Sequence, residues 1–406
     1  MVSVGHNTRL LVLDNLSAAR TALQALGVEE AGVEIMAPKA VHYVLKVERI
    51  PLRAAHILKQ EMLSLGGEAA VPRGVLALAV EESDVILMGT VRQLRRLAEK
   101  LRHQYFGLPQ LGEEILGVLA RAEEPPSGVL DCRGRPLVLG ERTLVMGILN
   151  VTPDSFSDGG LYLDPEKALA RAQEMVAEGA DLIDVGAVST RPGHLPVPPE
   201  EEWRRLEPVL GPLVRSVNVP VAVDTWRAET ARAALEAGVH LINDQWALRG
   251  DPALAAVAAR YGAPVILMHN QDHRTYRDLM GDIIRFLREG IRLAEEAGIP
   301  PEKIIVDPGI GFGKDTAQNL EVLQHLGELR SLGKPILLGT SRKSVIGNTL
   351  GLPVGERLEG TAATVALGIA QGADIVRVHD VAAMVRVARM TDAIVRRRPG
   401  ERQNHG

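Results

Sequence analysis

The chain has 406 residues and a net charge of −5 at pH 7; 46% of its residues are hydrophobic and 3% are aromatic. This length favours two domains, or one large barrel with an addition, and the apolar content is enough for a sizeable core. The negative charge argues against a surface that binds nucleic acid throughout.

The single cysteine, Cys132, cannot form an internal disulfide, which fits a reducing cytoplasm. We expect it to be a partly buried, small apolar residue. The apolar run at residues 10–13 is too short for a signal peptide or a membrane span. The sequence therefore predicts a cytoplasmic protein that binds neither membrane nor nucleic acid.

Residues 1–122 alternate short apolar runs with amphipathic stretches, which predicts a small α+β domain of unknown role. We expect strands at 9–13, 41–47, 75–80 and 85–88, and helices at 17–26, 51–65 and 91–103. The basic face of the last helix is most simply a solvated surface; the alternative is contact with a partner or an anion. Residues 123–140 form a linker, Glu-Glu-Pro-Pro-Ser-Gly, followed by a hairpin at 129–138.

From residue 141 to about 400 an apolar strand is followed eight times by a polar loop and, in most cases, by an amphipathic stretch. The predicted strands are 144–149, 182–185, 219–223, 240–242, 265–268, 304–306, 336–338 and 375–378. The predicted helices include 165–178, 200–214, 228–237, 278–297, 317–332 and 358–371. The pattern indicates an α/β fold, a (β/α)8 TIM barrel preceded by the small α+β domain, with a doubly wound open sheet as the alternative.

Polar side chains stand where the predicted strands end, and in such a barrel these ends form the active site. They are Asn150, Asp184, Asp224, Asn243, Asp244, His269, Asn270, Asp307, Ser341, Arg342, Lys343, Arg377, His379 and Asp380. Asp244, Asn270 and Asp380 could individually be loop caps. The whole set is too regular for that explanation.

The set divides by charge. Asp184, Asp224, Asp307 and Asn243 suit a flat heterocycle with several N–H donors, because a carboxylate forms two-pronged hydrogen bonds with adjacent ring N–H and amino groups. A metal site is the weaker alternative, since cationic side chains share the same mouth. Those cations suit phosphate or carboxylate oxygens, so we expect a substrate with an anionic half. They are Arg191, Arg342, Lys343, Arg377 and His379.

Taken together, these motifs resemble the dihydropteroate synthase family over residues 140–400. The resemblance rests on GILNVTPDSFSDGG (147–160), STRPG (189–193), VDT (223–225), IND (242–244), DPGIGFGK (307–314), GTSRKS (339–344) and RVHDV (377–381). It implies a (β/α)8 barrel that condenses 6-hydroxymethyl-7,8-dihydropterin diphosphate with 4-aminobenzoate. It further implies that the activity depends on Mg2+, that the protein is a homodimer, and that sulfonamides inhibit it.

By the same resemblance, the pterin would be held by Asp224, Asn243, Asp307 and Lys343, with Asp184 nearby. Asn150, Arg377 and His379 would bind diphosphate, with Mg2+ coordinated through Asn150, and residues 152–160 would cover the reacting methylene. Met268 would pack against a ring, beside Gly339. The aminobenzoate side would comprise Thr190, Arg191, Pro192, Phe312, Ser341, Arg342 and Lys343.

The chain departs from the family pattern at three places. Val188 stands where the family commonly has Glu, Gln245-Trp246 is unusual, and Asn270 replaces a customary Met. Two alternatives therefore stay open. One is a methyltetrahydrofolate methyltransferase that serves a corrinoid, which would not need the loops at 150–160 and 341–343. The other is a pterin-binding protein without catalysis.

Overall fold

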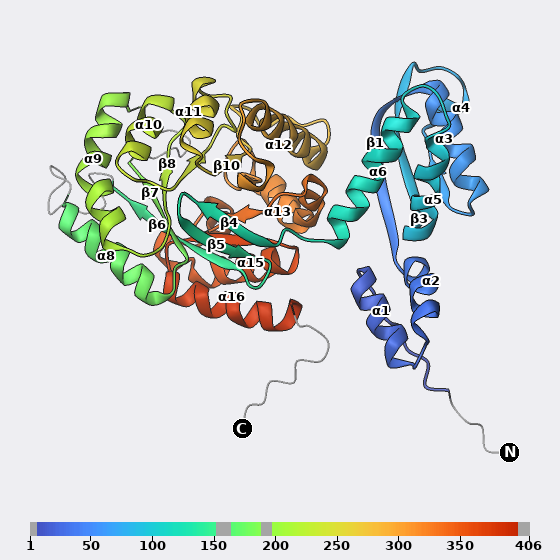
Figure 1. Ribbon diagram of the computed structural model, residues 1–406, viewed down its shortest axis with the longest axis horizontal. Helices are drawn as coiled ribbons and strands as arrows, with labels where there is room; N and C mark the ends of the chain where they lie inside the picture. The colour runs from blue at the N-terminus through green and yellow to red at the C-terminus, as the bar shows by residue number, and fades with distance from the viewer. Residues whose placement is uncertain (1–5, 152–163, 188–196, 397–406) are drawn as a thin grey trace. The chain divides into compact units, whose positions relative to one another are not determined.

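The computed structural model describes residues 6–151, 164–187 and 197–396. Its chain divides into two compact units, unit 1 with residues 1–124 and unit 2 with residues 125–406, each shown in Figure 1. No helix in the described part of the chain is both long enough and apolar enough to span a membrane.

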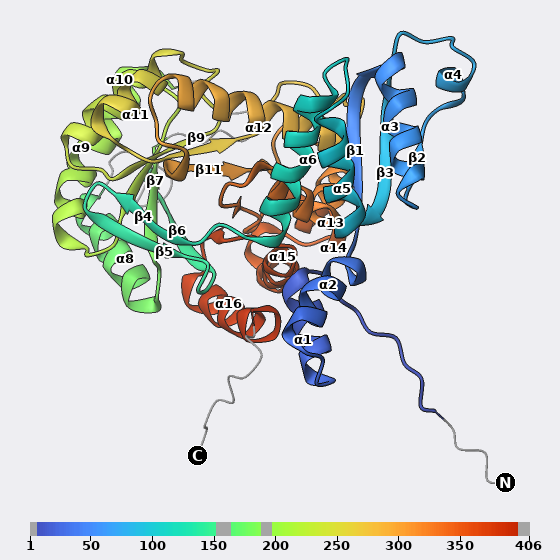
Figure 2. The ribbon, with the colours of Figure 1, turned by 45° about the vertical axis from the view of Figure 1, so that its right-hand side comes forward.

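Unit 1 is an α+β unit built on a three-stranded antiparallel sheet of order β1-β3-β2. Its strands are β1 (His42–Pro51), β2 (Glu68–Ala70) and β3 (Glu82–Thr90). In Figure 2 the long strands β1 and β3 run side by side, and Val85 and Leu87 of β3 are fully buried in the unit's core. The helices are α1 (Leu16–Ala25), α2 (Glu30–Ala40), α3 (Leu52–Ser64), α4 (Arg73–Leu76), α5 (Val91–Leu101) and α6 (Leu108–Glu123).

Two strands predicted in unit 1 are wrong. Residues 9–13 form no strand, and Leu10 is 87% exposed, because no neighbouring strand pairs with this segment. Residues 75–80 contain the end of the short helix α4 and a turn; the helix starts directly after Pro72, whose fixed φ suits a helix start. The predicted strands at 41–47 and 85–88 are confirmed within β1 and β3.

Unit 2 is a parallel eight-stranded sheet of order β11-β10-β9-β8-β7-β6-β13-β12, with a parallel bridge from Val306 to Ile336 that joins its two edges. The (β/α)8 barrel is therefore confirmed. Its strands are β6 (Leu144–Asn150), β7 (Leu182–Gly186), β8 (Val221–Asp224), β9 (Leu241–Asp244), β10 (Val265–Met268), β11 (Ile304–Asp307), β12 (Leu337–Leu338) and β13 (Ile375–Val378).

Helices surround the strands: α8 (Pro165–Glu178), α9 (Pro199–Ser216), α10 (Ala228–Glu236), α11 (Ala253–Tyr261), α12 (Leu279–Glu296), α13 (Thr316–Gln324), α14 (Ser344–Leu350), α15 (Leu358–Ala370) and α16 (Val381–Val395). Short 3-10 helices are η1 (Pro301–Lys303), η2 (Leu326–Leu332) and η3 (Val354–Glu356). The predicted helix 317–332 is instead α13 followed by η2, with Gly327 near the junction, where glycine weakens a helix.

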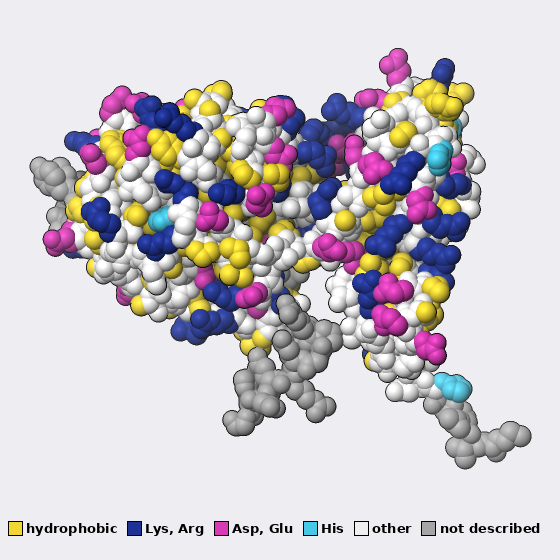
Figure 3. Space-filling view, viewed as in Figure 1, with side chains coloured by type: hydrophobic (Ala, Val, Ile, Leu, Met, Phe, Trp, Pro, Cys, Tyr) yellow, Lys and Arg dark blue, Asp and Glu magenta, His cyan; other side chains and the backbone are white. Residues whose placement is uncertain are grey.

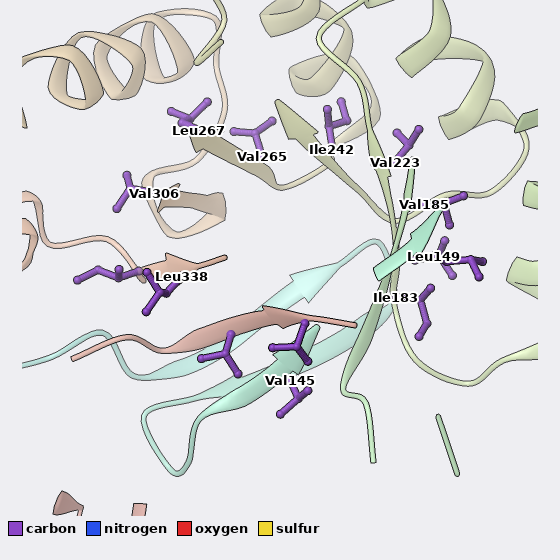
Figure 4. Close-up of a cluster of buried hydrophobic side chains, with 14 of the residues drawn as sticks. Val145, Leu149, Ile183, Val185, Val223, Ile242, Val265, Leu267, Val306 and Leu338 are labelled. Atoms are coloured by element: carbon purple, nitrogen blue, oxygen red, sulfur yellow. The ribbon is translucent and has the colours of Figure 1, made fainter. Parts of the chain in front are cut away.

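Alternation along each strand divides the barrel's apolar residues into two sets. Figure 4 shows the outward set, which includes Val145, Ile183 and Val223 and packs beneath the helices. The inward set fills the barrel with one or two side chains from each strand. Its members are Leu144, Met146, Leu182, Ala222, Leu241, Ile266, Ile305, Leu337 and Ile375.

A β-hairpin closes the amino-terminal end of the barrel. It consists of β4 (Gly128–Cys132) and β5 (Arg135–Leu139), which confirms the predicted hairpin. Its buried side chains Leu130, Cys132, Leu137 and Leu139 join the inward set in one apolar cluster. The inside of the barrel is thus filled and covered at this end, and only the carboxyl ends of the strands are left to build a site.

Candidate active site

The site residues follow the inward apolar set at a spacing of two. Since successive side chains of a strand alternate between its faces, the residue two places after an inward one also points into the barrel. Leu182 is thus followed by Asp184 and Ile305 by Asp307. The full second layer reads Asp184, Asp224, Asn243, Met268, Asp307, Gly339 and Arg377. Strand geometry alone therefore brings the predicted polar strand ends together.

A buried ion cluster lies at the centre of this layer. The Arg377 guanidinium donates to Asp184 Oδ2 through Nε at 2.6 Å and to Asp224 Oδ2 through Nη2 at 3.0 Å. Asn243 Nδ2 donates to Asp184 Oδ2 at 3.1 Å, and Gln245 Nε2 donates to Asp224 Oδ1 at 2.6 Å. The arrangement differs from the expected cationic rim, because Arg377 turns toward the carboxylates.

The protonation of this cluster is perturbed. Burial, and then repulsion by Asp184, raise the pKa of Asp224 to about 7, against the opposing effect of Arg377. Burial works against the Arg377 charge, but Asp184 and Asp224 raise its pKa above the ordinary value. Asp184 is fully buried, and among the described residues its Oδ1 has no hydrogen-bond partner. A buried oxygen of this kind calls for a donor from a ligand.

Asp307 ends β11 and begins the loop that follows it. Its Oδ1 accepts from the Gly309 N–H at 2.7 Å, and burial raises the pKa of its carboxyl above the usual value. Lys343, which follows β12, donates its Nζ to the Ile310 carbonyl and lies 4.9 Å from the centre of the Phe312 ring. Asp307, Phe312 and Lys343 therefore lie close together at one side of the mouth.

The loops after β12 and β13 are joined by two contacts. Ser341 Oγ accepts from the His379 N–H at 3.1 Å and lies 3.0 Å from His379 Nδ1. Arg342 pairs with Asp380, its Nε donating at 2.9 Å, so Asp380 anchors a loop. Gly339 leaves room beneath these loops, since a Cβ there would lie 3.7 Å from both Lys343 Nζ and Arg377 Cβ.

The remaining predicted residues fall into three groups. Asn150 is partly exposed at the end of β6, and Met268 is buried at the end of β10. Asp244 is structural, because it accepts from the Trp246 and Leu248 N–H groups. The third group, Thr190, Arg191, Pro192, Val188 and the segment 152–160, lies outside the described residues.

Gln245 belongs to the buried ion cluster, although the sequence alone singles it out only as a departure from the family pattern. It directly follows β9, and its carboxamide donates to the Asp224 carboxylate, so it helps to orient that side chain. Its place next to the polar strand end Asn243-Asp244 is the signal that could have identified it.

Within the described residues, no three His, Cys, Asp or Glu side chains gather closely enough to ligate a metal by themselves. Asn150 offers one amide oxygen at the carboxyl end of β6, where its side chain is partly exposed. Such a ligand suits Mg2+, which often takes one or two protein ligands and completes its shell with water and phosphate oxygens.

The model of the family described as "Pterin binding enzyme" matches residues 146–379. A dihydropteroate synthase of Clostridium beijerinckii is 53% identical over 260 residues, covering 64% of this chain and 97% of the relative. A crystal structure of dihydropteroate synthase from Clostridium difficile in the presence of pteroic acid is 53% identical, with a TM-score of 0.63, covering 64% of this chain and 99% of that one.

Two further similarities extend this picture. A dihydropteroate synthase of Xanthomonas albilineans with 4-aminobenzoic acid is 46% identical, with a TM-score of 0.64, covering 66% of this chain and 98% of that one. A probable bifunctional folylpolyglutamate synthase/dihydropteroate synthase of Halobacterium salinarum is 44% identical over 388 residues. This match covers 94% of the chain and 46% of the relative, so the similarity continues into unit 1.

Proposed function

The chain belongs to the family of pterin-binding enzymes, and from this premise we infer that it acts as a dihydropteroate synthase. The reaction condenses 6-hydroxymethyl-7,8-dihydropterin diphosphate with 4-aminobenzoate and yields 7,8-dihydropteroate and diphosphate. Relatives of this name, and solved structures that hold pteroic acid or 4-aminobenzoic acid, support this assignment.

One structural observation on this chain's own residues supports pterin binding. Asp184 Oδ1 is buried beside Asp224 and Asn243 in the barrel, and no described residue forms a hydrogen bond with it. A pterin presents adjacent amino and ring N–H donors along one edge. Such an edge would supply the missing donor and pair with the carboxylates in a two-pronged manner.

We assign the pterin to Asp224, Asn243, Asp307 and Lys343, with Asp184 beneath it. The diphosphate would meet Asn150 and His379 at the mouth. Nε and Nη2 of Arg377 already donate to Asp184 and Asp224, so Arg377 would contact the diphosphate through Nη1. The 4-aminobenzoate would lie between Phe312, Ser341 and the loop 190–192.

In the reaction the aniline nitrogen attacks the methylene carbon, and the C–O bond breaks with its electron pair going to diphosphate. Positive charge develops on the pterin methylene, and ionised Asp224 and Asp307 stabilise it. Negative charge develops on the leaving oxygen, which Arg377 and His379 stabilise. The attacking nitrogen is neutral at pH 7 and loses its proton after the new C–N bond forms, so it needs no general base beforehand.

We further propose that Mg2+ accompanies the diphosphate and that the amide oxygen of Asn150 is its protein ligand. When bound, the ion would neutralise charge on the phosphate oxygens. The partly exposed position of Asn150 at the end of β6 supports this role.

The test is to mix the protein with dihydropterin diphosphate, 4-aminobenzoate and Mg2+ and to measure dihydropteroate and diphosphate. We expect both products in equal amounts, with loss of turnover in EDTA and in Asn150→Ala. Arg377→Ala should impair use of the diphosphate substrate. Pterin binding without diphosphate release would instead support the non-catalytic alternative, and methyl transfer from methyltetrahydrofolate to a corrinoid would support the other.

We propose that unit 1 is an accessory module and not part of the catalytic machinery. The match with the relative from Clostridium beijerinckii covers 97% of that protein but only 64% of this chain. A protein named dihydropteroate synthase therefore has no counterpart to about a third of this chain. We also propose, from the family and the sequence, that the protein is a homodimer and that it acts in the cytoplasm. Sedimentation of the purified protein tests the dimer.

A further inference from the structure

A buried lysine lies behind the site and takes no part in the chemistry assigned above. Lys314 follows the loop after β11, and it is only 5% exposed. Its Nζ lies 2.9 Å from His269 Nδ1 and donates to the carbonyls of Gly309 at 3.0 Å and Phe312 at 3.1 Å. An ammonium has three protons, and here each of them has one acceptor.

In the pair formed by Lys314 and His269, the histidine is neutral and the lysine is charged below about pH 7. Burial, and then the charge of Lys314, lower the pKa of His269 to about 2, so its Nδ1 is available as an acceptor. Burial lowers the pKa of Lys314 to about 7, while Asp307 acts in the opposite direction. The three acceptors replace the hydrogen bonds with water that the ammonium loses when it is buried.

This pair ties the loop of β11 to the end of β10. His269 is 1% exposed and packs edge-on against Phe286, with ring centroids 4.7 Å apart. The loop lies so close that a Cβ on Gly309 would come within 1.9 Å of the His269 carbonyl oxygen. Tyr276 adds a bond from its hydroxyl to the Gly313 carbonyl at 2.8 Å. His269, directly after β10, and Tyr276, in the segment that follows it, therefore contact the two ends of the 309–313 loop.

The same loop holds Lys343. The Ile310 carbonyl accepts from Lys343 Nζ, and the Phe312 ring lies beside that ammonium. The Lys343 side chain also crosses Gly311, where a Cβ would come within 3.3 Å of its Cδ. A shift of this loop would therefore move both Phe312 and Lys343.

We propose that Lys314 is a positioning residue, whose buried ammonium fixes the 309–313 loop on His269 and thereby sets the places of Phe312 and Lys343 at the mouth. The proposal rests on the assignment of these two residues to the substrates. The strands hold Asp184, Asp224 and Asn243 independently of this loop. Loss of Lys314 should therefore weaken 4-aminobenzoate binding through Phe312, and it should weaken pterin binding to a smaller extent, because Lys343 is only one of the residues assigned to the pterin.

The test compares Lys314→Met with the matched control Lys334→Met. Lys334 is also buried, at 8% exposed, and it donates to the Pro301 carbonyl at 2.8 Å, but it precedes β12 at the opposite end of the barrel. We expect Lys314→Met to raise KM for 4-aminobenzoate about tenfold, with a smaller rise in KM for dihydropterin diphosphate that reflects the displacement of Lys343. Lys334→Met should lower the melting temperature and leave both KM values as in the wild type.

A second variant keeps the test decisive if Lys314→Met does not fold. His269→Phe preserves the aromatic packing on Phe286 and removes only the Nδ1 acceptor. It should raise KM for 4-aminobenzoate in the same direction, and the double variant should show less than the product of the two single effects.

Two results would overturn the proposal: a KM for 4-aminobenzoate in both variants equal to that of the wild type, or multiplicative effects in the double variant. A wild-type protein without turnover would be a different outcome, since it would contradict the proposed function itself.

Discussion

The clearest test of the site's electrostatics is Asp184→Asn. The substitution keeps the shape of the side chain and an oxygen that can accept from Arg377, but it removes one negative charge from the buried cluster. In the wild type, burial and then repulsion by Asp184 raise the pKa of Asp224 to about 7. Removing that repulsion should lower the pKa of Asp224, although burial will hold it above its ordinary value of 3.8.

The size of the shift follows from Coulomb's law. Two carboxylates that share one guanidinium lie roughly 5 Å apart, and at an effective dielectric constant of about 20 their repulsion is about 3 kcal/mol. This corresponds to about two pKa units as an upper bound, because Arg377 partly screens the pair. We therefore expect the pKa of Asp224 to fall by about one to two units. Loss of one charged acceptor for Arg377 should cost about 2 kcal/mol of stability.

The assay is the pH dependence of kcat/KM for dihydropterin diphosphate, together with carbon NMR of labelled aspartate. If ionised Asp224 is required, activity of the wild type falls as the pH drops below about 7, and in Asp184→Asn this fall occurs at lower pH. Asp380→Asn is the control, since Asp380 pairs with Arg342 outside the buried cluster. An acidic limb that stays in place, or that moves upward, would refute the reasoning.

The same group makes a prediction for stability. The folded protein holds the Asp224 proton up to a pKa of about 7, whereas the unfolded chain releases it near 3.8. Asp224 therefore favours folding fully below the lower value and loses that contribution as the pH rises through this window. Thermal melts between pH 4 and 8 should show a smaller decline from this group in Asp184→Asn than in the wild type.

Three further predictions follow from the fold and the family. Sulfonamides should compete with 4-aminobenzoate and not with dihydropterin diphosphate, as measured by initial rates; a solved Yersinia pestis relative, 43% identical, holds such a drug. Removal of residues 1–124 should leave kcat within about twofold of the full chain, because unit 2 has its own core and holds the assigned site residues. Leu137→Ala, in the hairpin that closes the barrel, should lower the free energy of unfolding by about 2–4 kcal/mol with unchanged KM values, measured by urea denaturation and kinetics.

The barrel could be predicted because its strands are short apolar runs that end in polar residues. A strand such as β10 is buried on both faces, so its sequence carries one continuous signal, and its bounds 265–268 match the prediction. Residues 9–13 carry a similar apolar signal but lack a partner strand. Whether a partner exists depends on the rest of the fold, which local sequence does not reveal.

The sequence predicts which residues form the site better than it predicts the hydrogen bonds between their side chains. The strand ends identified Asp184, Asp224 and Arg377 as neighbours, but not that the guanidinium would turn inward to both carboxylates. Those partners are separated by more than 150 positions along the chain, and side-chain direction at a strand end depends on the charges opposite. The role of Lys314 could not be predicted either, because its acceptors, His269 Nδ1 and two backbone carbonyls, come together only once the loop after β11 is folded.

The distribution of charge over the surface agrees with the composition. On the face shown in Figure 3, acidic and basic side chains are interspersed over unit 2. The described residues include exposed ion pairs such as Arg292 with Glu289, and pairs of this kind contribute little to stability. The charges that we assign to the proposed function are the few within the barrel.

The hairpin of β4 and β5 has a kinetic consequence. Because the hairpin closes the barrel at the amino-terminal ends of the strands, ligands can enter and leave only at the carboxyl ends. A ligand bound deepest in the barrel must therefore enter before the next ligand and leave after it. Dihydropterin diphosphate is the substrate assigned to this deepest position. We therefore expect ordered binding, with the pterin first and the amine second, and we expect the barrel's architecture to enforce this order without a moving part.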